Sequence, residues 1–471
     1  MTQIIGRDDE KKQLAYYLEM ESSEFLVVYG RRRVGKTFLI RNFYAQNFCF
    51  HFTGLANAGT NQQLINFQLA INEQTNLDFP LVHSWLLAFE QLKSVIQRSD
   101  QKKKVIFFDE MPWLDTPKSD FLTAFEYFWN HFCAARNDIL LIACGSATSW
   151  LTHKIFNNKG GLHNRVTRQM EILPFSLSEC EAYFLSKNFV FERYQIVESY
   201  MIMGGIPYYL SLMEKGKSFA QNIDLLFFHR KALLKNEFKN LYASLFRHAE
   251  NHILVVEALS EKISGLTRDE ISKVTHIPSG GGLTKVLKEL EVCGFIRQYQ
   301  TLDHKAKNEL YQLTDFYTLF YFQFINNQHI NDENYWLYTI DSPKHRAWSG
   351  FAFERVCLAH GAQIKKALGI SGVRTYLFSW KSKEADHPVQ IDLCIDRNDQ
   401  VINICEIKYS IHQFTIDKSG YENLMRKISA FKTETKTKKA VYLTMITTFG
   451  LVENGYALNL LQNQITMDDL F

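Results

Sequence analysis

The sequence lacks paired cysteines and any long apolar run, and we expect no signal peptide. Its eight cysteines stand singly, without a C-x-x-C pair, so neither a zinc ribbon nor a dithiol redox motif is expected. We expect buried, reduced thiols, which are typical of a cytoplasmic protein. The first residues, MTQIIGRDDEKK, contain no apolar core of a signal peptide. No apolar stretch is long enough to span a bilayer, so the sequence predicts no membrane partner.

The sequence also has little net charge. The formal net charge is only +3 over 471 residues, so a long-range basic field for nucleic acid is absent and DNA binding would need a local patch. Hydrophobic residues make up 46% and charged residues 22%, which is the profile of a soluble globular protein. The length predicts roughly three or four domains.

What the sequence does contain is a series of short apolar runs separated by helical patterns. A helical pattern, FLTAFEYFWNHF, lies between the third run and the fourth. Strands that alternate with helices predict an α/β fold with a parallel sheet covered on both faces. The runs that predict buried strands are residues 25–30, 49–54, 105–109, 139–145 and 170–175.

A phosphate-binding motif follows the first of these strands directly. Residues 30–37 read GRRRVGKT, which fits G-x-x-x-x-G-K-[ST], and they lead into the helical segment FLIRNFYAQ. Glycines let backbone N–H groups close around phosphates, and the helix N-terminus adds partial positive charge. Lys36 is expected to reach the β- and γ-phosphates, and the Thr37 hydroxyl is expected to ligate Mg²⁺. The motif predicts ATP and Mg²⁺ as cofactors, and the residues expected to bind them are Gly30, Arg33, Val34, Gly35, Lys36, Thr37 and Phe38.

Two acidic residues after the third run complete this prediction. Asp109 ends the run VIFFD, where a buried carboxylate is costly unless a cation binds it directly or through water. Glu110 follows and is placed to polarise the attacking water. Ser146, after the run ILLIACG, is a candidate sensor of the γ-phosphate, with an ordinary turn serine as the alternative. Arg165 and Arg168 are candidates for a transition-state clamp, and a solvated surface position is the equal alternative for each.

The middle of the chain changes to a helical pattern. Residues 176–245 read as helices interrupted by Gly204-Gly205-Ile206-Pro207, where we expect a rigid bend. Three helices and two alternating strands over residues 246–335 favour a winged helix-turn-helix. Its basic residues could contact phosphates, and a spacer that transmits the nucleotide state is the alternative. The aromatic segment 311–325 predicts a buried helix, with a base-stacking platform as the alternative.

The C-terminal unit, residues 340–471, carries three polar residues on a predicted hairpin. Asp392 lies on the run IDLCID, and Glu406 and Lys408 lie on the run VINICEIKY beyond a polar turn. Residues two apart on a strand point to one face, and cross-strand pairing brings Asp392 beside them. Both runs are apolar on both faces, so two carboxylates beside one lysine need a bound cation. Asp392 and Glu406 are hard oxygen ligands suited to Mg²⁺, and Lys408 would position water or stabilise charge on a phosphate.

A second set of the same residue types carries no such prediction. Asp224, Glu237 and Lys239 have a similar spacing, but the segment between them lacks a turn and reads as a continuous helix. On a helix, residues two apart point in different directions, so Glu237 and Lys239 would diverge.

The motifs of the first half resemble a known family. GRDDEKKQL, YGRRRVGKT, FFDEMPWL, CGSATSW, NRVTRQMEILPF and GGIPYYL, within residues 4–245, are similar to the archaeal-type ATPases of the STAND branch of the AAA+ superfamily. The resemblance implies a P-loop ATPase core over residues 1–175, a helical lid over 176–245 and a winged helix-turn-helix over 246–335. It also implies that Gly6 and Arg7 lie in a segment lining the adenine pocket.

The C-terminal unit resembles the PD-(D/E)XK nuclease core, which longer members of that group carry. The resemblance implies a restriction-endonuclease-like α/β domain in which Glu354, on the helix candidate WSGFAFERVCLAHG, precedes Asp392, Glu406 and Lys408. Residue 391 is Ile where the name of the motif has Pro. An intact metal site and a degenerate core that only binds both stay open.

The sequence therefore predicts a cytoplasmic ATP-hydrolysing protein. Its nucleotide state would be coupled to a Mg²⁺-dependent nuclease-like domain that acts on nucleic acid, with DNA endonuclease activity. The alternative is an ATP-switched signalling scaffold whose C-terminal domain binds DNA or protein without cleavage. The sequence leaves open whether the protein forms a homo-oligomer.

Overall fold

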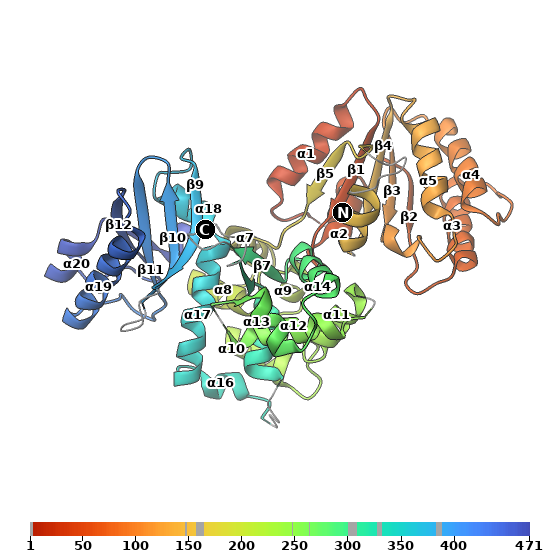
Figure 1. Cartoon of the computed structure of the whole chain (residues 1–471). Coiled ribbons are helices and arrows are strands. Elements are labelled where there is room, and N and C mark those ends of the chain that lie inside the picture. Colours follow the sequence, from red (N-terminus) through yellow and green to blue (C-terminus); the bar gives the residue numbers. More distant parts are fainter. Residues whose placement is uncertain are drawn as a thin grey trace. The chain divides into compact units, whose positions relative to one another are not determined.

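The chain divides after Pro174 into two units, residues 1–174 and 175–471 (Figure 1). The structure is a computed structural model that describes residues 3–146, 148–156, 164–246, 248–262, 264–299, 309–326, 332–382 and 389–471. Among these residues no helix combines the length and the apolar character needed to cross a bilayer. The cysteines are free, and all but the half-buried Cys49 are buried.

The first unit is built on a five-stranded parallel sheet in the order β2-β3-β4-β1-β5. The predicted strands and their parallel arrangement are confirmed. Four strands lie within one residue of their predicted bounds. The fifth was predicted over 170–175 but spans Arg168–Glu171, and it ends shortly before Pro174, whose nitrogen cannot donate to a sheet. The strands are β1 (Glu24–Tyr29), β2 (Phe48–Thr53), β3 (Lys104–Asp109), β4 (Ile139–Cys144) and β5 (Arg168–Glu171).

Helices cover both faces of this sheet. Apolar side chains of α3, α4 and α5 pack on one face around Phe89 and Phe108, and the three helices lie together in Figure 1. The helices of this unit are α1 (Asp8–Glu19), α2 (Lys36–Phe43), α3 (Thr60–Thr75), α4 (Trp85–Arg98), α5 (Phe121–Phe128) and α6 (Thr148–Leu151), with the short turns η1 (Met111–Trp113), η2 (Trp129–Cys133) and η3 (Thr152–Phe156).

The second unit begins with helices that bend sharply at the predicted break. Gly204 and Gly205 both have positive φ, at 63° and 66°, between α8 and α9. A Cβ on Gly205 would lie 2.2 Å from the carbonyl oxygen of Phe175, so no side chain fits there. The helices are α7 (Leu177–Ser186), α8 (Arg193–Met203), α9 (Pro207–Leu210), α10 (Phe219–Ile223), η4 (Asp224–Phe228) and α11 (Glu237–Leu245).

The continuous helix predicted from Asp224 to Lys239 is wrong. The helical turn η4 ends at Phe228, and α11 begins only at Glu237. The Asp224 carboxylate accepts hydrogen bonds from the backbone N–H groups of Trp336 (2.7 Å) and Leu337 (3.1 Å) in α16 (Tyr335–Thr339). A partner more than a hundred residues away thus fixes this segment, which local sequence could not predict.

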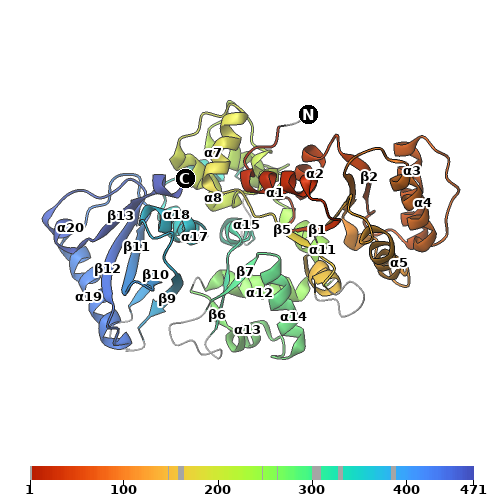
Figure 2. The ribbon, with the colours of Figure 1, turned by 90° about the horizontal axis from the view of Figure 1, so that it is seen from above.

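Three helices and a small antiparallel sheet follow, in the order β6-β8-β7 (Figure 2). The predicted wing tip, residues 300–308, lies outside the described residues, and the winged-helix assignment stays a prediction. In the aromatic segment the first residues form a strand, and the buried helix begins only at Phe316. The elements are α12 (Glu250–Glu261), β6 (Leu266–Thr267), α13 (Arg268–Thr275), α14 (Gly281–Val292), β7 (Ile296–Tyr299), β8 (Leu310–Leu313), α15 (Phe316–Phe320) and η6 (Tyr321–Ile325).

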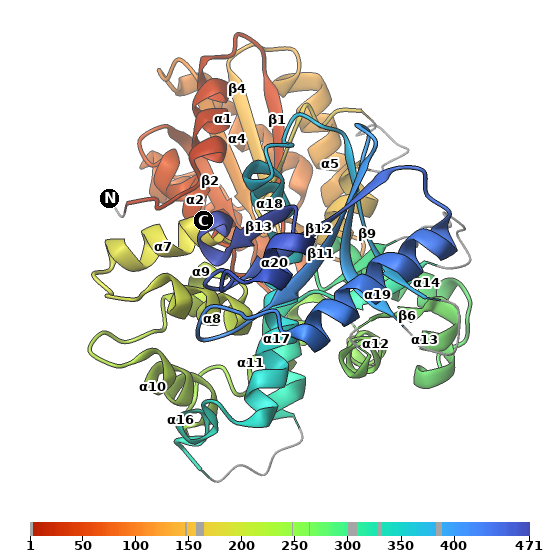
Figure 3. The ribbon, with the colours of Figure 1, turned by 90° about the vertical axis from the view of Figure 1, so that its left-hand side faces the viewer.

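The C-terminal part is a mixed sheet in the order β13-β12-β11-β10-β9, with α17 and α19 packed on it (Figure 3). The predicted hairpin is present, since β10 and β11 pair antiparallel, and β11, β12 and β13 run parallel. The elements are α17 (Pro343–Ala359), α18 (Gly361–Ala367), β9 (Thr375–Lys381), β10 (Gln390–Arg397), β11 (Val401–Lys408), α19 (Lys418–Thr435), β12 (Ala440–Thr447), α20 (Gly455–Leu460), β13 (Asn463–Thr466) and η7 (Met467–Leu470).

Helix α8 packs against this C-terminal sheet through aromatic rings. The ring of Tyr194 stacks on Tyr409, with centroids 5.4 Å apart, and on Phe449, at 5.5 Å. Glu198 lies one turn further along α8, and burial raises its pKa to about 7. An acidic side chain is therefore buried next to the junction of α8 with the C-terminal sheet.

We expect Glu198→Gln to stabilise the protein above pH 7. The pKa of Glu198 is raised on folding from an ordinary value near 4.5, so the folded state binds the extra proton and stability falls as pH rises from about 4.5 to 7. The amide cannot ionise, so the variant should gain about 2 kcal/mol at pH 8 and nothing at pH 4. Urea unfolding at both pH values measures the difference. Glu453→Gln, an exposed site, is the control, and equal pH dependence of the Glu198 variant and wild type would contradict the assignment.

Candidate nucleotide site and a second acidic site

The loop between β1 and α2 contains several residues with positive φ, a conformation that glycine adopts without strain. Gly30, Arg33 and Gly35 all have positive φ, at 131°, 72° and 91°. A Cβ on Gly30 would lie 2.3 Å from the carbonyl oxygen of Ile172, so the close approach of two backbones requires glycine there. The loop therefore curls tightly at the carboxyl end of β1, as its sequence predicts.

The Lys36 side chain lies inside this curl. Its ammonium donates to the carbonyl oxygens of Gly30 (2.9 Å) and Arg31 (2.8 Å), and the residue is only 6% exposed. The neighbouring Thr37 hydroxyl donates to Asp109 Oδ1 at 2.9 Å. The loop and the end of β3 are thus joined by the two groups predicted to hold Mg²⁺.

Asp109 is a buried carboxylate at the end of β3. Burial raises its pKa, and the hydrogen bond from Thr37 offsets part of this effect, while the negative charge of Glu110 adds to it. A divalent cation at this point would favour the charged form again. The chemistry of the donor set, a hydroxyl beside a costly carboxylate, therefore fits Mg²⁺.

Glu110 is held by Ser146. The Glu110 carboxylate accepts from the Ser146 hydroxyl at 3.0 and 3.1 Å and from its backbone N–H at 3.3 Å. Glu110 has φ 49°, a left-handed conformation that is costly for a non-glycine residue and is often found at functional sites. Strand order explains the contact, because β4 lies beside β3 and brings Ser146 to the same edge. A γ-phosphate contact of Ser146 stays a prediction.

Arg7 supports the phosphate-binding loop through hydrogen bonds to backbone carbonyl oxygens. It is 5% exposed and donates to the carbonyl oxygens of Val34 (3.2 Å) and Leu173 (2.6 Å), while Glu10 pairs with it at 3.3 Å. Gly6 and Arg7 both have positive φ, which turns the chain into α1. Sequence reasoning missed this bracing role, and the lining of an adenine pocket by Gly6 and Arg7 stays a prediction.

The other predicted nucleotide residues differ in exposure. Val34 is buried, at 1% exposed, and Phe38 on the first turn of α2 is 43% exposed. Phe38 is therefore accessible to a ligand, whereas the Val34 side chain anchors the loop in the core.

Arg168 does not lie at the nucleotide edge of its own sheet. It begins β5 and donates to Glu24, the first residue of β1, at 3.1 Å. Because the sheet is parallel, this contact lies at the edge opposite to the phosphate-binding loop. Arg168 therefore cannot contact the transition state at the nucleotide site of its own chain, and that prediction is wrong. Arg165 is exposed, and its role in a transition-state clamp stays a prediction.

A second cluster lies at one end of the C-terminal hairpin. Glu406 is 6% exposed, and its two carboxylate oxygens pair with Lys408 (2.8 Å) and Lys427 of α19 (2.7 Å). Burial alone would raise the pKa of Glu406, but the two lysines hold it below the ordinary value. Sequence reasoning missed Lys427, which reaches the strand only because α19 packs on the sheet.

Asp392 and Glu354 line a cavity of about 580 Å³ beside this ion-paired group, together with Lys427. Burial and the charge of Asp392 raise the pKa of Glu354 to about 8. Leu393 pairs with Cys405, so the same register continued by one residue sets Asp392 opposite Glu406. The structure thus brings the four predicted residues to one end of the sheet.

The carboxylate oxygens of this second site suit a divalent cation, provided that Glu406 gives up one of its lysine partners. A cation would favour the charged forms of Asp392 and Glu354 together, but Glu406 can bind it only by releasing a lysine. Across the part of the chain that the structure describes, no three His, Cys, Asp or Glu side chains are already grouped to hold a metal. The metal site therefore stays a prediction.

Comparisons with known proteins find similarities to the first part of the chain and to most of its length. Residues 5–213 match a family described as an ATPase domain predominantly from Archaea. The uncharacterized protein MJECL04 of Methanocaldococcus jannaschii is 25% identical over 432 residues, which cover 90% of this chain and 91% of that protein.

Among solved structures, the Walker-type ATPase of Pyrococcus abyssi is similar with a TM-score of 0.51. It is 17% identical, and the match covers 68% of this chain and 96% of that one. The ORC2 protein of Aeropyrum pernix is similar with a TM-score of 0.43 and 12% identity, over 76% of this chain and 96% of that one. The predicted archaeal-type ATPase domain with a P-loop fold is therefore confirmed, while the nuclease-like assignment stays a prediction.

Proposed function

We propose that the protein binds and hydrolyses ATP and that the nucleotide state controls its C-terminal nuclease-like site on nucleic acid. One observation supports the first half most strongly. The groups needed for phosphate, cation and water meet at the carboxyl edge of one parallel sheet, linked through Thr37–Asp109 and Glu110–Ser146.

The side chains of this edge would divide the work. Lys36 would exchange the carbonyl oxygens of Gly30 and Arg31 for oxygens of the β- and γ-phosphates. Thr37 and Asp109 would hold Mg²⁺, which when bound neutralises charge on those phosphates. Glu110, kept in place by Ser146, would orient the attacking water and take its proton.

The second half rests on the convergence of Glu354, Asp392, Glu406 and Lys408 at one end of the C-terminal sheet. Asp392 and Glu406 would hold a divalent cation, which when bound supplies charge stabilisation at the phosphate. Lys408 would stabilise the charge that develops as water adds to phosphorus and one P–O bond breaks. The water's proton passes to solvent and the leaving oxygen takes one up.

A signalling scaffold is the second candidate, and a specific contact favours it. Both oxygens of Glu406 are already paired with lysines, so the cluster is electrostatically satisfied as an internal ion network. A C-terminal domain with this network could bind DNA or protein without cutting it, while ATP switches the assembly.

We expect wild-type protein to cleave DNA with Mg²⁺ or Mn²⁺ and ATP, and Asp392→Ala to lose at least about a hundredfold in rate. The substrates are supercoiled plasmid and single-stranded circular DNA, and Lys36→Ala tests the dependence on ATP. Asp399→Ala, in the turn at the far end of the same hairpin, is the matched control.

Mg²⁺ or Mn²⁺ should stabilise wild-type protein more than Asp392→Ala. Millimolar Mg²⁺ or Mn²⁺ should raise the melting temperature of the full chain by mass action, and Asp392→Ala should remove the part due to this site. One outcome would exclude the nuclease function and leave the signalling scaffold. In that outcome the wild-type protein binds ATP but does not cleave DNA, and metal changes its melting temperature no more than that of Asp392→Ala.

A further inference from the structure

Three cavities adjoin along α17. The first, of about 300 Å³, and the second, of about 580 Å³, share Glu261 and Phe351 in their walls. The second and the third, of about 250 Å³, share Glu354 and Asp392. The three cavities therefore form a row from the first cavity to the acidic residues of the C-terminal hairpin, and we call this row the groove.

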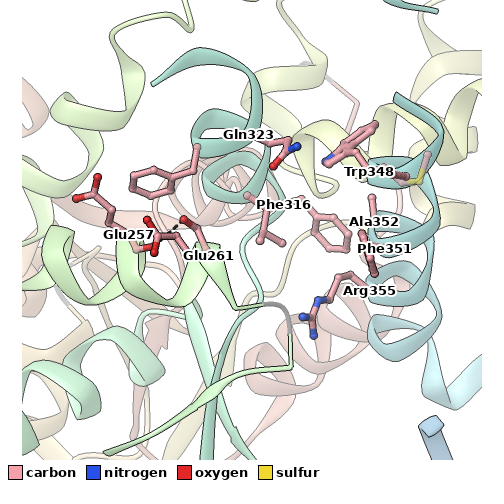
Figure 4. A pocket seen from close by; sticks show the side chains of 13 residues that line it. Glu257, Glu261, Phe316, Gln323, Trp348, Phe351, Ala352 and Arg355 are labelled. Atoms are coloured by element: carbon pink, nitrogen blue, oxygen red, sulfur yellow. Dashed lines mark hydrogen bonds between the residues drawn. The ribbon is translucent and has the colours of Figure 1, made fainter. Parts of the chain in front are cut away.

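The first cavity has aromatic walls and an acidic side (Figure 4). Rings of Phe316 and Trp348 line it, and Phe351 at its junction with the second cavity is 45% exposed. Figure 4 shows Glu257 and Glu261 together on one side, across from α17. Phe316 and Trp348 are each only 7% exposed, so the Phe351 ring is the exposed stacking surface for a planar group. Glu257 and Glu261 attract hydrogen-bond donors and repel phosphates.

The second cavity places cations beside its acidic side chains, and two of these cations are also ion-paired, Lys262 with Glu270 and Lys427 with Glu406. Three cations line it, namely Lys262 at the end of α12 and Arg426 and Lys427 on α19. Cations in a groove are the groups that follow a phosphodiester backbone, whatever its sequence. The groove thus offers a place for a planar base and, next to it, a path for phosphates that leads to Asp392.

We propose that this groove binds an unpaired polynucleotide strand, with a base bearing an exocyclic amino group in the first cavity and its backbone along the cations of the second. The inference rests on the proposed nuclease-like function and names its substrate class. The strand is single because a base that enters a walled cavity must have left its stack and its pair. The base carries an amino group because Glu257 and Glu261 accept hydrogen bonds, as acidic residues do from cytosine N4.

Binding of fluorescent oligonucleotides to the full chain in EDTA tests this without cleavage. Oligo-dC and oligo-dA should bind about tenfold tighter than oligo-dT, and a blunt duplex should bind more weakly than any of them. Phe351→Ala should weaken single-strand binding about tenfold, because a base loses the ring on which it stacks, and Phe351→Tyr should restore binding. Glu261→Ala should remove the preference over oligo-dT.

Three controls accompany these measurements: a variant outside the cavities, a check of folding, and a comparison of RNA with DNA. Tyr338→Ala removes an exposed ring of α16 that lines none of these cavities, and should leave binding unchanged. Urea unfolding of each variant checks that the second unit, which contains the three substituted positions, is folded. Comparing oligo-rC with oligo-dC assigns RNA or DNA.

Three results would count against the inference in distinguishable ways. If duplex DNA is bound and cleaved at least as well as single strands, and Phe351→Ala has no effect, single strands are not the preferred substrate. The proposed nuclease function would remain. Absence of both binding and cleavage for every nucleic acid would remove the nuclease half as well. Equal binding of oligo-dT and oligo-dC would remove the role given to the glutamates.

Discussion

Lys36→Ala is expected to weaken ATP binding by at least about a hundredfold. The ammonium is held inside the loop by two carbonyl oxygens, so it is already placed where phosphates would bind. Charged hydrogen bonds contribute about 1.5–3 kcal/mol each, and two of them correspond to roughly two to four decades of affinity. Calorimetric titration of the full chain with ATP and Mg²⁺ measures the loss.

The control for this variant is Lys12→Ala. Lys12 lies on α1 in the same unit and is largely exposed, so its removal changes the charge by the same amount without touching the loop. Its ATP affinity should equal that of wild type. Unchanged ATP affinity in Lys36→Ala would show that the loop is not the nucleotide site.

Glu110→Gln is expected to keep ATP binding and to lower the hydrolysis rate by about 10²–10⁴-fold. The amide can still accept hydrogen bonds from Ser146, so the loop and its neighbours should keep their positions. It cannot take a proton from water as a carboxylate does, which is the contribution expected of a general base. Phosphate release at saturating ATP measures the rate, and the calorimetric affinity shows that binding is intact.

Two further variants sharpen this test. Ser146→Ala should slow hydrolysis less than Glu110→Gln, because it frees the carboxylate without removing it. Glu19→Gln, an exposed residue of α1, should hydrolyse ATP as wild type does. Normal turnover in Glu110→Gln would mean that another group positions the water.

The nucleotide site could be predicted well because its signal is local. The glycines, Lys36 and Thr37 lie within eight residues, directly between an apolar strand and a helix, and β1 and α2 form there. The same holds for the hairpin of Asp392 and Glu406, whose two strands are joined by a short polar turn.

The contacts that complete each site are not local and could not be predicted. Ser146 meets Glu110 only because β4 stands between β1 and β3, and no residue pattern specifies that strand order. Lys427 reaches Glu406 from a helix that follows the hairpin. The end of the helical turn at Phe228 could not be predicted either, because Asp224 accepts from N–H groups of α16, more than a hundred residues further along the chain.

The buried Arg7 connects two points of the first unit that are far apart in the sequence. One guanidinium nitrogen holds the carbonyl of Val34, inside the phosphate-binding loop, and also that of Leu173, the residue before Pro174. A nucleotide that shifts the Val34 carbonyl must either break a buried hydrogen bond or carry Arg7 with it. The displacement would then reach Leu173, where the chain leaves this unit for the next. Arg7, the residue just before α1, would thereby transmit a movement of the occupied loop to the point where the chain leaves the unit.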